Sequence, residues 1–179
     1  EGPAGLRIRF LGTGASDWKG LDERGEWRRW SSILVDNAVL VDFTAQSVDQ
    51  LPAGVRPEAI FYTHSHRDHY DPAAAGELGV AVPAVRGLAF GETVEERGVR
   101  FTCVPANHGT SRTGERAGMF LIEKGEERLL YATDTGGIMA EAARIVGIDA
   151  HVRDGKPITA LVMEATMGVG YEDDFRIYT

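Results

Sequence analysis

The chain has 179 residues, 43% of them hydrophobic and 26% charged, which is enough for one domain with a substantial core. Its formal net charge of −8 disfavours nucleic acid as a partner, because such binding depends on neutralising phosphates. A single cysteine, Cys103, excludes an intramolecular disulfide, and no apolar run approaches the roughly 18 residues that span a bilayer. We therefore expect one domain over residues 1–179, a cytoplasmic location and no membrane partner.

Short apolar runs predict strands along the whole chain. They lie near residues 6–11, 31–43, 58–63, 81–85, 99–105, 118–133 and 157–163, with a hairpin turn about Gly125. Between them, Asp71-Pro72 has the pattern of an N-cap and first helical position. A second helix is predicted from a stripe of Ile138, Met139, Ala142, Ile145 and Val146. A solvated helix face is predicted at Glu92, Glu95 and Glu96.

The most informative segment is the hexapeptide His64-Ser65-His66-Arg67-Asp68-His69. Its imidazoles and carboxylate concentrate nitrogen and oxygen ligands that suit zinc, manganese or iron, and a hydrophobic core needs no such cluster. The apolar run 59–63 predicts a buried strand that delivers the cluster at its carboxyl end. In an extended stretch the first two histidines point the same way, whereas the aspartate and the last histidine follow a turn. The spacing therefore predicts two metal ions side by side.

This spacing resembles the His-x-His-x-Asp-His motif of the metallo-β-lactamase fold superfamily, and other segments match that superfamily in the expected order. The resemblance implies an α/β fold, a four-layer αββα sandwich with a dinuclear metal site. The implied metal ligands are His64, His66, Asp68, His69, His108 and Asp134. Asp134, in a Thr-Asp-Thr-Gly stretch, would bridge both ions, and Asp42 would lie beneath the site as a supporting residue.

The run Phe10-Leu11-Gly12-Thr13-Gly14 resembles the branch that contains ribonuclease Z and the cyclic phosphodiesterases of phosphonate breakdown. The glycines would let the backbone approach the metals closely, with a tight turn as the alternative explanation. Arg28 or Arg29, ahead of the second strand, could meet a phosphate, although a solvated loop is the simpler explanation for each.

The chain also departs from these relatives. Because Cys103 is its only cysteine, the cysteine-rich structural zinc site of the phosphonate-pathway enzymes cannot form. Met163-Glu164-Ala165-Thr166 stands where ribonuclease Z has His-Glu-Ala-Thr, and a long basic insertion for gripping transfer RNA is absent. No histidine follows His151, which we interpret as a surface residue, so the last ligand of the second metal is missing. We expect that the carboxy-terminal part of the domain is missing from this chain.

The resemblance implies a metal-dependent hydrolase that uses a hydroxide activated by two divalent ions, zinc in preference to manganese or iron. Asp68 would bind the second ion and orient the hydroxide as a catalytic residue. The expected substrate is a small phosphate ester, cyclic esters included, which makes the activity that of a phosphodiesterase. The acid that protonates the leaving group stays open between Tyr70, Glu164 and the missing histidine.

Two alternatives remain. A lactone or thioester hydrolase would use the same dinuclear site, so the ligands do not choose between carbonyl carbon and phosphorus. A degraded non-catalytic or RNA-processing member would explain the missing last histidine, and near-absence of bound metal would favour it. A homodimer is also open, since Trp18, Trp27 and Trp30 could form a substrate wall or a dimer contact, although core packing is the commoner role of tryptophan.

Overall fold

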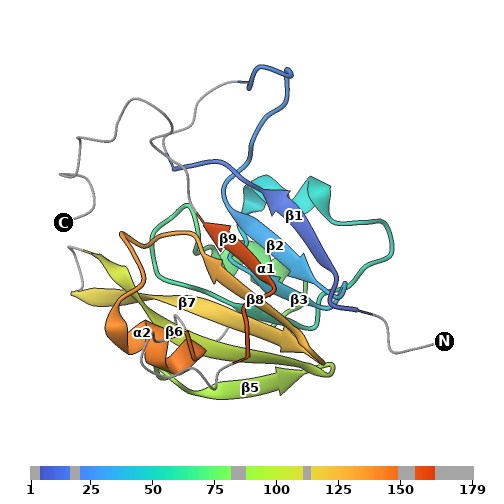
Figure 1. Ribbon diagram of the computed structural model, residues 1–179. Coiled ribbons are helices and arrows are strands. Elements are labelled where there is room, and N and C mark those ends of the chain that lie inside the picture. Colours follow the sequence, from blue (N-terminus) through green and yellow to red (C-terminus); the bar gives the residue numbers. More distant parts are fainter. Residues whose placement is uncertain (1–4, 17–20, 82–87, 111–113, 149–155, 164–179) are drawn as a thin grey trace. The chain divides into compact units, whose positions relative to one another are not determined.

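The computed structural model of the chain describes residues 5–16, 21–81, 88–110, 114–148 and 156–163. The chain divides into two compact units: an amino-terminal unit, Arg7–Gly87, and a carboxy-terminal unit, Leu88–Thr179 together with Glu1–Leu6. Each unit contains one sheet of mixed strand direction (Figure 1). Most of the strand expected at 81–85 lies outside the described residues, as do Trp18, His151 and Glu164.

The sheet of the amino-terminal unit has four strands in the order β1-β2-β3-β4. These are β1 (Ile8–Gly12), β2 (Ser32–Val35), β3 (Val39–Val41) and β4 (Ala59–Phe61). β1, β2 and β3 pair antiparallel, whereas β3 pairs parallel with β4. Because β3 and β4 run parallel, their carboxyl ends meet at one edge of the sheet. That edge receives Asp42 after β3 and the histidine cluster after β4.

One strand was expected over residues 31–43, and the structure has a hairpin of two. Asp36 and Asn37 connect them with φ values of 48° and 56°. Aspartate and asparagine adopt this left-handed conformation more readily than other non-glycine residues, and two such residues make the turn that suits a hairpin. Ala38 N donates to Val35 O at 2.9 Å and closes the turn.

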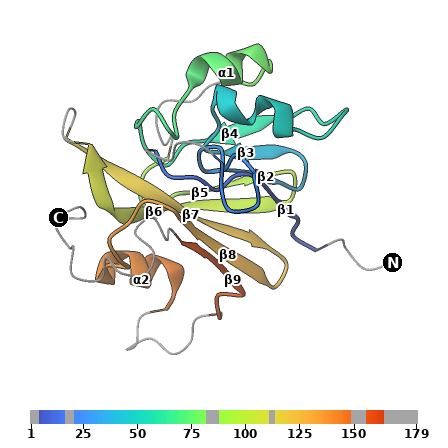
Figure 2. The same cartoon turned by 90° about the horizontal axis from the view of Figure 1, so that it is seen from above.

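Helix α1 (Pro72–Glu77) begins where the sequence predicts. The Asp71 side chain accepts a hydrogen bond from Ala74 N, and Pro72 occupies the first turn. Ala74 and Ala75 bring α1 against the first sheet (Figure 2). The core of this unit consists of Leu11, Leu34, Leu40, Phe43, Ile60, Tyr62, Ala74, Ala75 and Val80. A short 3-10 helix, η1 (Ala45–Gln50), was not expected from the sequence.

The sheet of the carboxy-terminal unit has five strands in the order β5-β6-β7-β8-β9. These are β5 (Thr93–Glu96), β6 (Val99–Thr110), β7 (Glu115–Lys124), β8 (Glu127–Ala132) and β9 (Ala160–Met163). Neighbours pair antiparallel except β8 and β9, which are parallel. The expected turn at Gly125 joins β7 to β8, with a φ of 59°.

The helix face predicted at the acidic cluster is wrong. Glu95 and Glu96 lie in β5, which pairs antiparallel with β6. The burial of these side chains has the two-residue period of a strand, because they are exposed and half-buried in turn along β5. Arg97 and Gly98, with φ values of 54° and 78°, then form the tight turn into β6.

Helix α2 (Ala140–Val146) confirms the predicted helix after residue 134 and packs on the sheet of its own unit. Its residues Ala142 and Val146 join a core formed with Val104, Ala106, Ala117, Met119, Leu121, Leu130 and Ala132. The helix ends at Gly147, whose φ of 80° is the left-handed conformation typical of a helix C-cap. Met139, predicted within the stripe, precedes the helix and is exposed.

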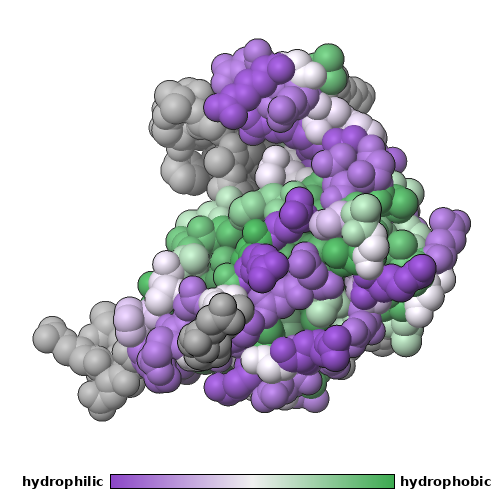
Figure 3. Space-filling model, turned by 90° about the vertical axis from the view of Figure 1, so that its right-hand side faces the viewer, coloured by the Kyte–Doolittle hydropathy of each residue, from purple (hydrophilic) through white to green (hydrophobic). Residues whose placement is uncertain are grey.

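Apolar side chains also reach the surface, as the green atoms on the face drawn in Figure 3 show. The large exposed ones include Phe10, Leu21, Trp27, Leu161 and Met163. Exposed apolar residues are common on folded proteins, so these residues alone indicate no partner. In the part of the chain that the structure describes, no helix is both long and apolar enough to cross a membrane.

Candidate metal centre

The loop after β4 gathers three imidazoles. The chain passes His64 and His66 beyond the end of β4 and then turns, with the amides of His69 and Tyr70 both donating to His66 O at 2.9 Å. This turn, which the sequence predicted, brings the His69 ring within 4.4 Å of the His64 ring, centroid to centroid. The His66 ring lies 4.6 Å from the His64 ring in an edge arrangement. His64, Asp68 and His69 are buried.

Asp42 lies beneath this cluster and is fully buried. Its backbone has a φ of 52°, an uncommon value for a non-glycine residue, and its amide donates to Phe61 O at 2.9 Å. Its carboxylate accepts three hydrogen bonds: from Thr63 N at 2.8 Å, from Thr63 Oγ1 at 2.8 Å and from His69 Nδ1 at 2.7 Å. A buried carboxylate is tolerated when it is hydrogen-bonded in this way, and Asp42 has the predicted supporting position.

These contacts define the histidine tautomers. Because the Thr63 hydroxyl gives its proton to Asp42, it accepts the proton of His64 Nδ1, 2.9 Å away. His69 Nδ1 donates directly to Asp42. Both rings therefore carry their proton on Nδ1, and each Nε2 keeps its lone pair. Histidines that ligate metals are typically oriented by just this kind of hydrogen bond from the remote nitrogen.

The metal-binding atoms of the cluster lie in two pairs. His64 Nε2 lies 2.9 Å from His66 Nδ1, a separation at which two imidazole nitrogens share either a proton or a cation. His69 Nε2 lies 3.2 Å from Asp68 Oδ2. Nitrogen paired with nitrogen, and nitrogen paired with carboxylate oxygen, are both donor sets that suit zinc, manganese or iron. The residues present thus fit divalent ions on chemical grounds.

His108 lies in a β-bulge of β6. The register passes from Pro105 paired with Gly118 directly to Gly109 paired with Arg116, so the three residues between them on β6 face one on β7. A bulge of this kind re-aims side chains, and bulges are frequent next to active sites. The regular alternation of a strand would not predict where His108 points.

Asp134 follows β8, and two hydrogen bonds to the backbone of Asn107 hold its segment against the bulge. The Thr135 hydroxyl accepts from Asn107 N at 2.9 Å and donates to Gly137 O at 2.7 Å. Gly136 N donates to Asn107 O at 3.1 Å. As a result His108 Nε2 lies 3.7 Å from Asp134 Oδ2, with a quarter of each side chain exposed.

The structure therefore places every predicted site residue in one of two clusters. Five lie together in the amino-terminal unit, namely Asp42, His64, His66, Asp68 and His69. His108 and Asp134 lie together in the carboxy-terminal unit. Sequence reasoning missed Thr63, whose hydroxyl links Asp42 to His64, and Thr135, whose hydroxyl links the Asp134 segment to the backbone at Asn107. Each directly adjoins a predicted ligand, and that adjacency is the only sequence feature that could have revealed them.

The predicted Gly-x-Gly has a different role from the one expected. A Cβ on Gly12 would lie 1.9 Å from Trp30 O, and one on Gly14 would lie 2.0 Å from Arg28 O. Gly14 N also donates to Arg29 O at 2.7 Å. Neither glycine has a positive φ, so a tight turn does not require them. Both glycines are required instead by the close approach of their backbone to the backbone of residues 28–30 in the same unit.

The chain belongs to the family described as the beta-lactamase superfamily domain, whose model matches residues 72–169. The matched range contains His108 and Asp134 and begins just after the histidine cluster.

A similar curated protein is a UPF0173 metal-dependent hydrolase of Thermoplasma acidophilum. It is 28% identical over an alignment of 127 residues, and 59% of this chain is covered. The chain spans 56% of the length of that relative.

Similar solved structures confirm the expected α/β, metallo-β-lactamase-type fold. A diphosphatase from the PhnP family has a TM-score of 0.56 and 22% identity, with 79% of this chain and 70% of that chain covered. The metallo-β-lactamase fold protein YhfI from Bacillus subtilis has a TM-score of 0.53 and 14% identity, with 73% and 64% covered. MEM-A1, a subclass B3 metallo-β-lactamase from a soil metagenome, has a TM-score of 0.51 and 15% identity, with 87% and 75% covered. At these identities the likeness concerns the fold alone.

Proposed function

We propose that the chain is a metal-dependent hydrolase that holds two divalent ions, with zinc preferred. The observation that carries this proposal is the gathering of three imidazoles and the Asp68 carboxylate in one loop, above a buried network in which Thr63 and Asp42 hold the Nδ1 atoms of His64 and His69. The core alone requires no such concentration of metal-binding side chains. The name of the Thermoplasma relative, a metal-dependent hydrolase, supports the same conclusion.

The proposed ligands are those that the resemblance to the superfamily implies. His64, His66 and His108 would hold one ion, Asp68 and His69 the other, and Asp134 would bridge them. Within its own unit, the 3.7 Å between His108 Nε2 and Asp134 Oδ2 suits two ligands of one ion better than a hydrogen bond, which needs about 2.7–3.2 Å.

The proposed reaction is hydrolysis of a small phosphate ester. Bound divalent ions would supply hydroxide near neutral pH and offset charge on the phosphoryl oxygens. Asp68 would accept a hydrogen bond from the attacking water and orient it. Tyr70, the residue after His69, would be the candidate to protonate the leaving group, and its half-buried ring packs edge-on against Tyr62 at 4.7 Å. Burial, with the Asp71 carboxylate nearby, raises the pKa of Tyr62, which therefore stays a neutral donor.

Two features support phosphorus over carbonyl chemistry, and the net charge bears on the size of the substrate. The Phe-Leu-Gly-Thr-Gly run resembles phosphodiesterases, and a similar fold belongs to a diphosphatase of the PhnP family. The net charge of −8 favours a small substrate over a polynucleotide. A lactone or thioester hydrolase is the alternative, because the same ligands serve both reactions.

The test compares bis(p-nitrophenyl) phosphate with a panel of lactones and thioesters on the chain reconstituted with zinc or manganese. We expect phosphodiester hydrolysis that a chelator abolishes and added metal restores. Faster turnover of a lactone or thioester than of the phosphodiester would show that the chain is a carboxyl hydrolase and not a phosphodiesterase. Absence of any metal-dependent hydrolysis would favour the degraded member.

A further inference from the structure

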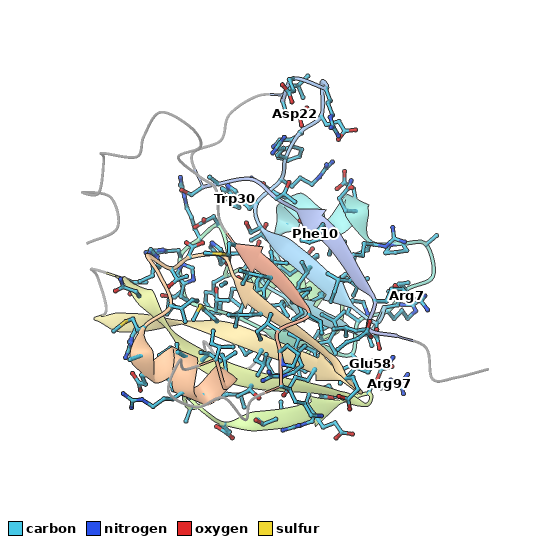
Figure 4. The ribbon with its side chains drawn as sticks, viewed as in Figure 1. Arg7, Phe10, Asp22, Trp30, Glu58 and Arg97 are labelled. Atoms are coloured by element: carbon cyan, nitrogen blue, oxygen red, sulfur yellow. The ribbon has the colours of Figure 1, made fainter. Side chains whose placement is uncertain are left out.

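One arginine lies inside the histidine cluster without an ion-pair partner among the described residues. Arg67 stands between His66 and Asp68, and its side chain is exposed. Its guanidinium carbon lies 6.0 Å from the ring centroid of Trp30, at the outer limit of a cation–π contact. Trp30 belongs to the segment between β1 and β2, where Figure 4 labels it.

The arginines that the sequence offered as phosphate ligands are engaged elsewhere. Arg28 Nε donates to Asp22 Oδ2 at 3.0 Å. Arg29 donates two hydrogen bonds, of 2.7 Å and 3.1 Å, to the Asp49 carboxylate, and these hydrogen bonds lower the pKa of Asp49. A phosphate bound by either arginine would have to displace a carboxylate. The solvated-loop explanation is therefore the better one for Arg28, whose partner lies in the same loop, whereas Arg29 ties that loop to η1.

Arg67 has the position and chemistry to contact a substrate anion. Arg67 adjoins His66 and Asp68 in the chain, and consecutive Cα atoms are about 3.8 Å apart, so its long, exposed side chain is able to reach an anion held beside these residues. A guanidinium presents a planar fork of N–H groups that matches two non-bridging phosphate oxygens. A neutral lactone offers no such charged pair of oxygens.

We propose that Arg67 binds the phosphate of the substrate and makes the site selective for anionic phosphate esters over neutral esters. The Trp30 ring supports one side of the guanidinium. This inference rests on the proposed function, since it identifies how the same site would choose its substrate class.

The test compares Arg67→Met and Arg67→Lys with Arg56→Met, which removes an exposed positive charge elsewhere in the same unit. Each variant is checked for metal content and circular dichroism and assayed with bis(p-nitrophenyl) phosphate and with dihydrocoumarin as a neutral lactone. We expect Arg67→Met to lower phosphodiester kcat/KM roughly ten-fold or more, mainly through KM. Lactone turnover stays unchanged, Arg67→Lys is intermediate because it keeps charge without the fork, and Arg56→Met matches the parent.

A second readout is independent of turnover. Calorimetric titration of the metal-loaded chain with inorganic phosphate should show binding that weakens roughly ten-fold in Arg67→Met and not in Arg56→Met. Equal phosphate affinity in Arg67→Met and the parent would overturn the inference, and so would an equal loss of lactone and phosphodiester turnover. If the parent hydrolyses no phosphodiester, the proposed function is wrong, and the phosphate titration still decides the role of Arg67.

Discussion

Asp42 sets the protonation of two histidines with one buried carboxylate. It acts on His69 directly and on His64 through the Thr63 hydroxyl. Only the contact with His64 depends on the Thr63 side chain, so Thr63 can be changed without removing the hydrogen bond between Asp42 and His69. The two halves of the network can therefore be tested separately.

Replacing Thr63 with valine removes the hydroxyl that receives the His64 proton, while Thr63→Ser keeps it. We expect Thr63→Val to weaken binding of one metal ion roughly 10- to 100-fold, the usual effect of losing a group that orients a ligand. Asp42→Asn should weaken both ions, since Asp42 serves both histidines. Competition with a chromogenic chelator measures each affinity. Unchanged affinity in Thr63→Val would mean that the hydroxyl does not orient His64.

At the scale of elements, ends and irregularities of strands bring the chemistry together. The cluster and Asp42 follow two parallel strands, Asp134 follows β8, and a bulge re-aims His108 within β6. The same elements depend on a few tight contacts elsewhere. Two of these contacts give predictions on stability.

Gly12→Ala should destabilise the chain by about 1–3 kcal/mol, because its Cβ would lie within 1.9 Å of a backbone oxygen and the backbone must move. Gly76→Ala is the matched control. Gly76 lies in α1 with no atom near its would-be Cβ, so alanine there should stabilise by up to about 1 kcal/mol. Urea denaturation of both variants gives the comparison. A neutral Gly12→Ala would show that this close approach is absent in solution.

Arg128 is a buried arginine that joins three elements of the carboxy-terminal unit. Its guanidinium donates to Glu123 Oε2 at 2.8 Å, to Val146 O at 2.6 Å near the end of α2, and to Lys156 O. Arg128→Met leaves the Glu123 carboxylate and two carbonyls without this partner and should cost about 3 kcal/mol of unfolding free energy.

Arg100 offers the control for this prediction, because it faces the same Glu123 at 3.8 Å but is 56% exposed. An exposed pair contributes little, so Arg100→Met should change stability by less than about 1 kcal/mol. Thermal denaturation of both variants measures the difference. Equal effects would contradict the role assigned to Arg128.

The sequence predicted strongly periodic or chemically dense segments well and irregular ones poorly. The cluster, the cap at Asp71 and the hairpin at Gly125 follow from local chemistry, and each is found where expected. The β6 bulge could not be foreseen, because a register shift depends on the partner strand. The acidic residues of β5 were misassigned for a related reason: charge pattern alone does not distinguish an exposed helix face from an exposed strand face.

At the scale of the whole molecule, a net charge of −8 has to coexist with an anionic substrate. Bound divalent ions and Arg67 would provide the local positive charge that the overall composition lacks. The proposed ligands come from segments far apart in sequence, so binding of metal would link those segments. It would then stabilise the folded chain by an amount that rises with the logarithm of metal concentration above Kd.

The metal-to-protein ratio is the sharpest test of the proposed dinuclear centre. Elemental mass spectrometry would be applied to the purified chain, to Asp134→Ala and to His151→Ala as a control histidine outside the proposed ligand set. The account predicts about two divalent ions per chain, a fall to one or fewer in Asp134→Ala, and no change in His151→Ala. A parent chain with almost no metal, or a ratio that Asp134→Ala leaves unchanged, would contradict it.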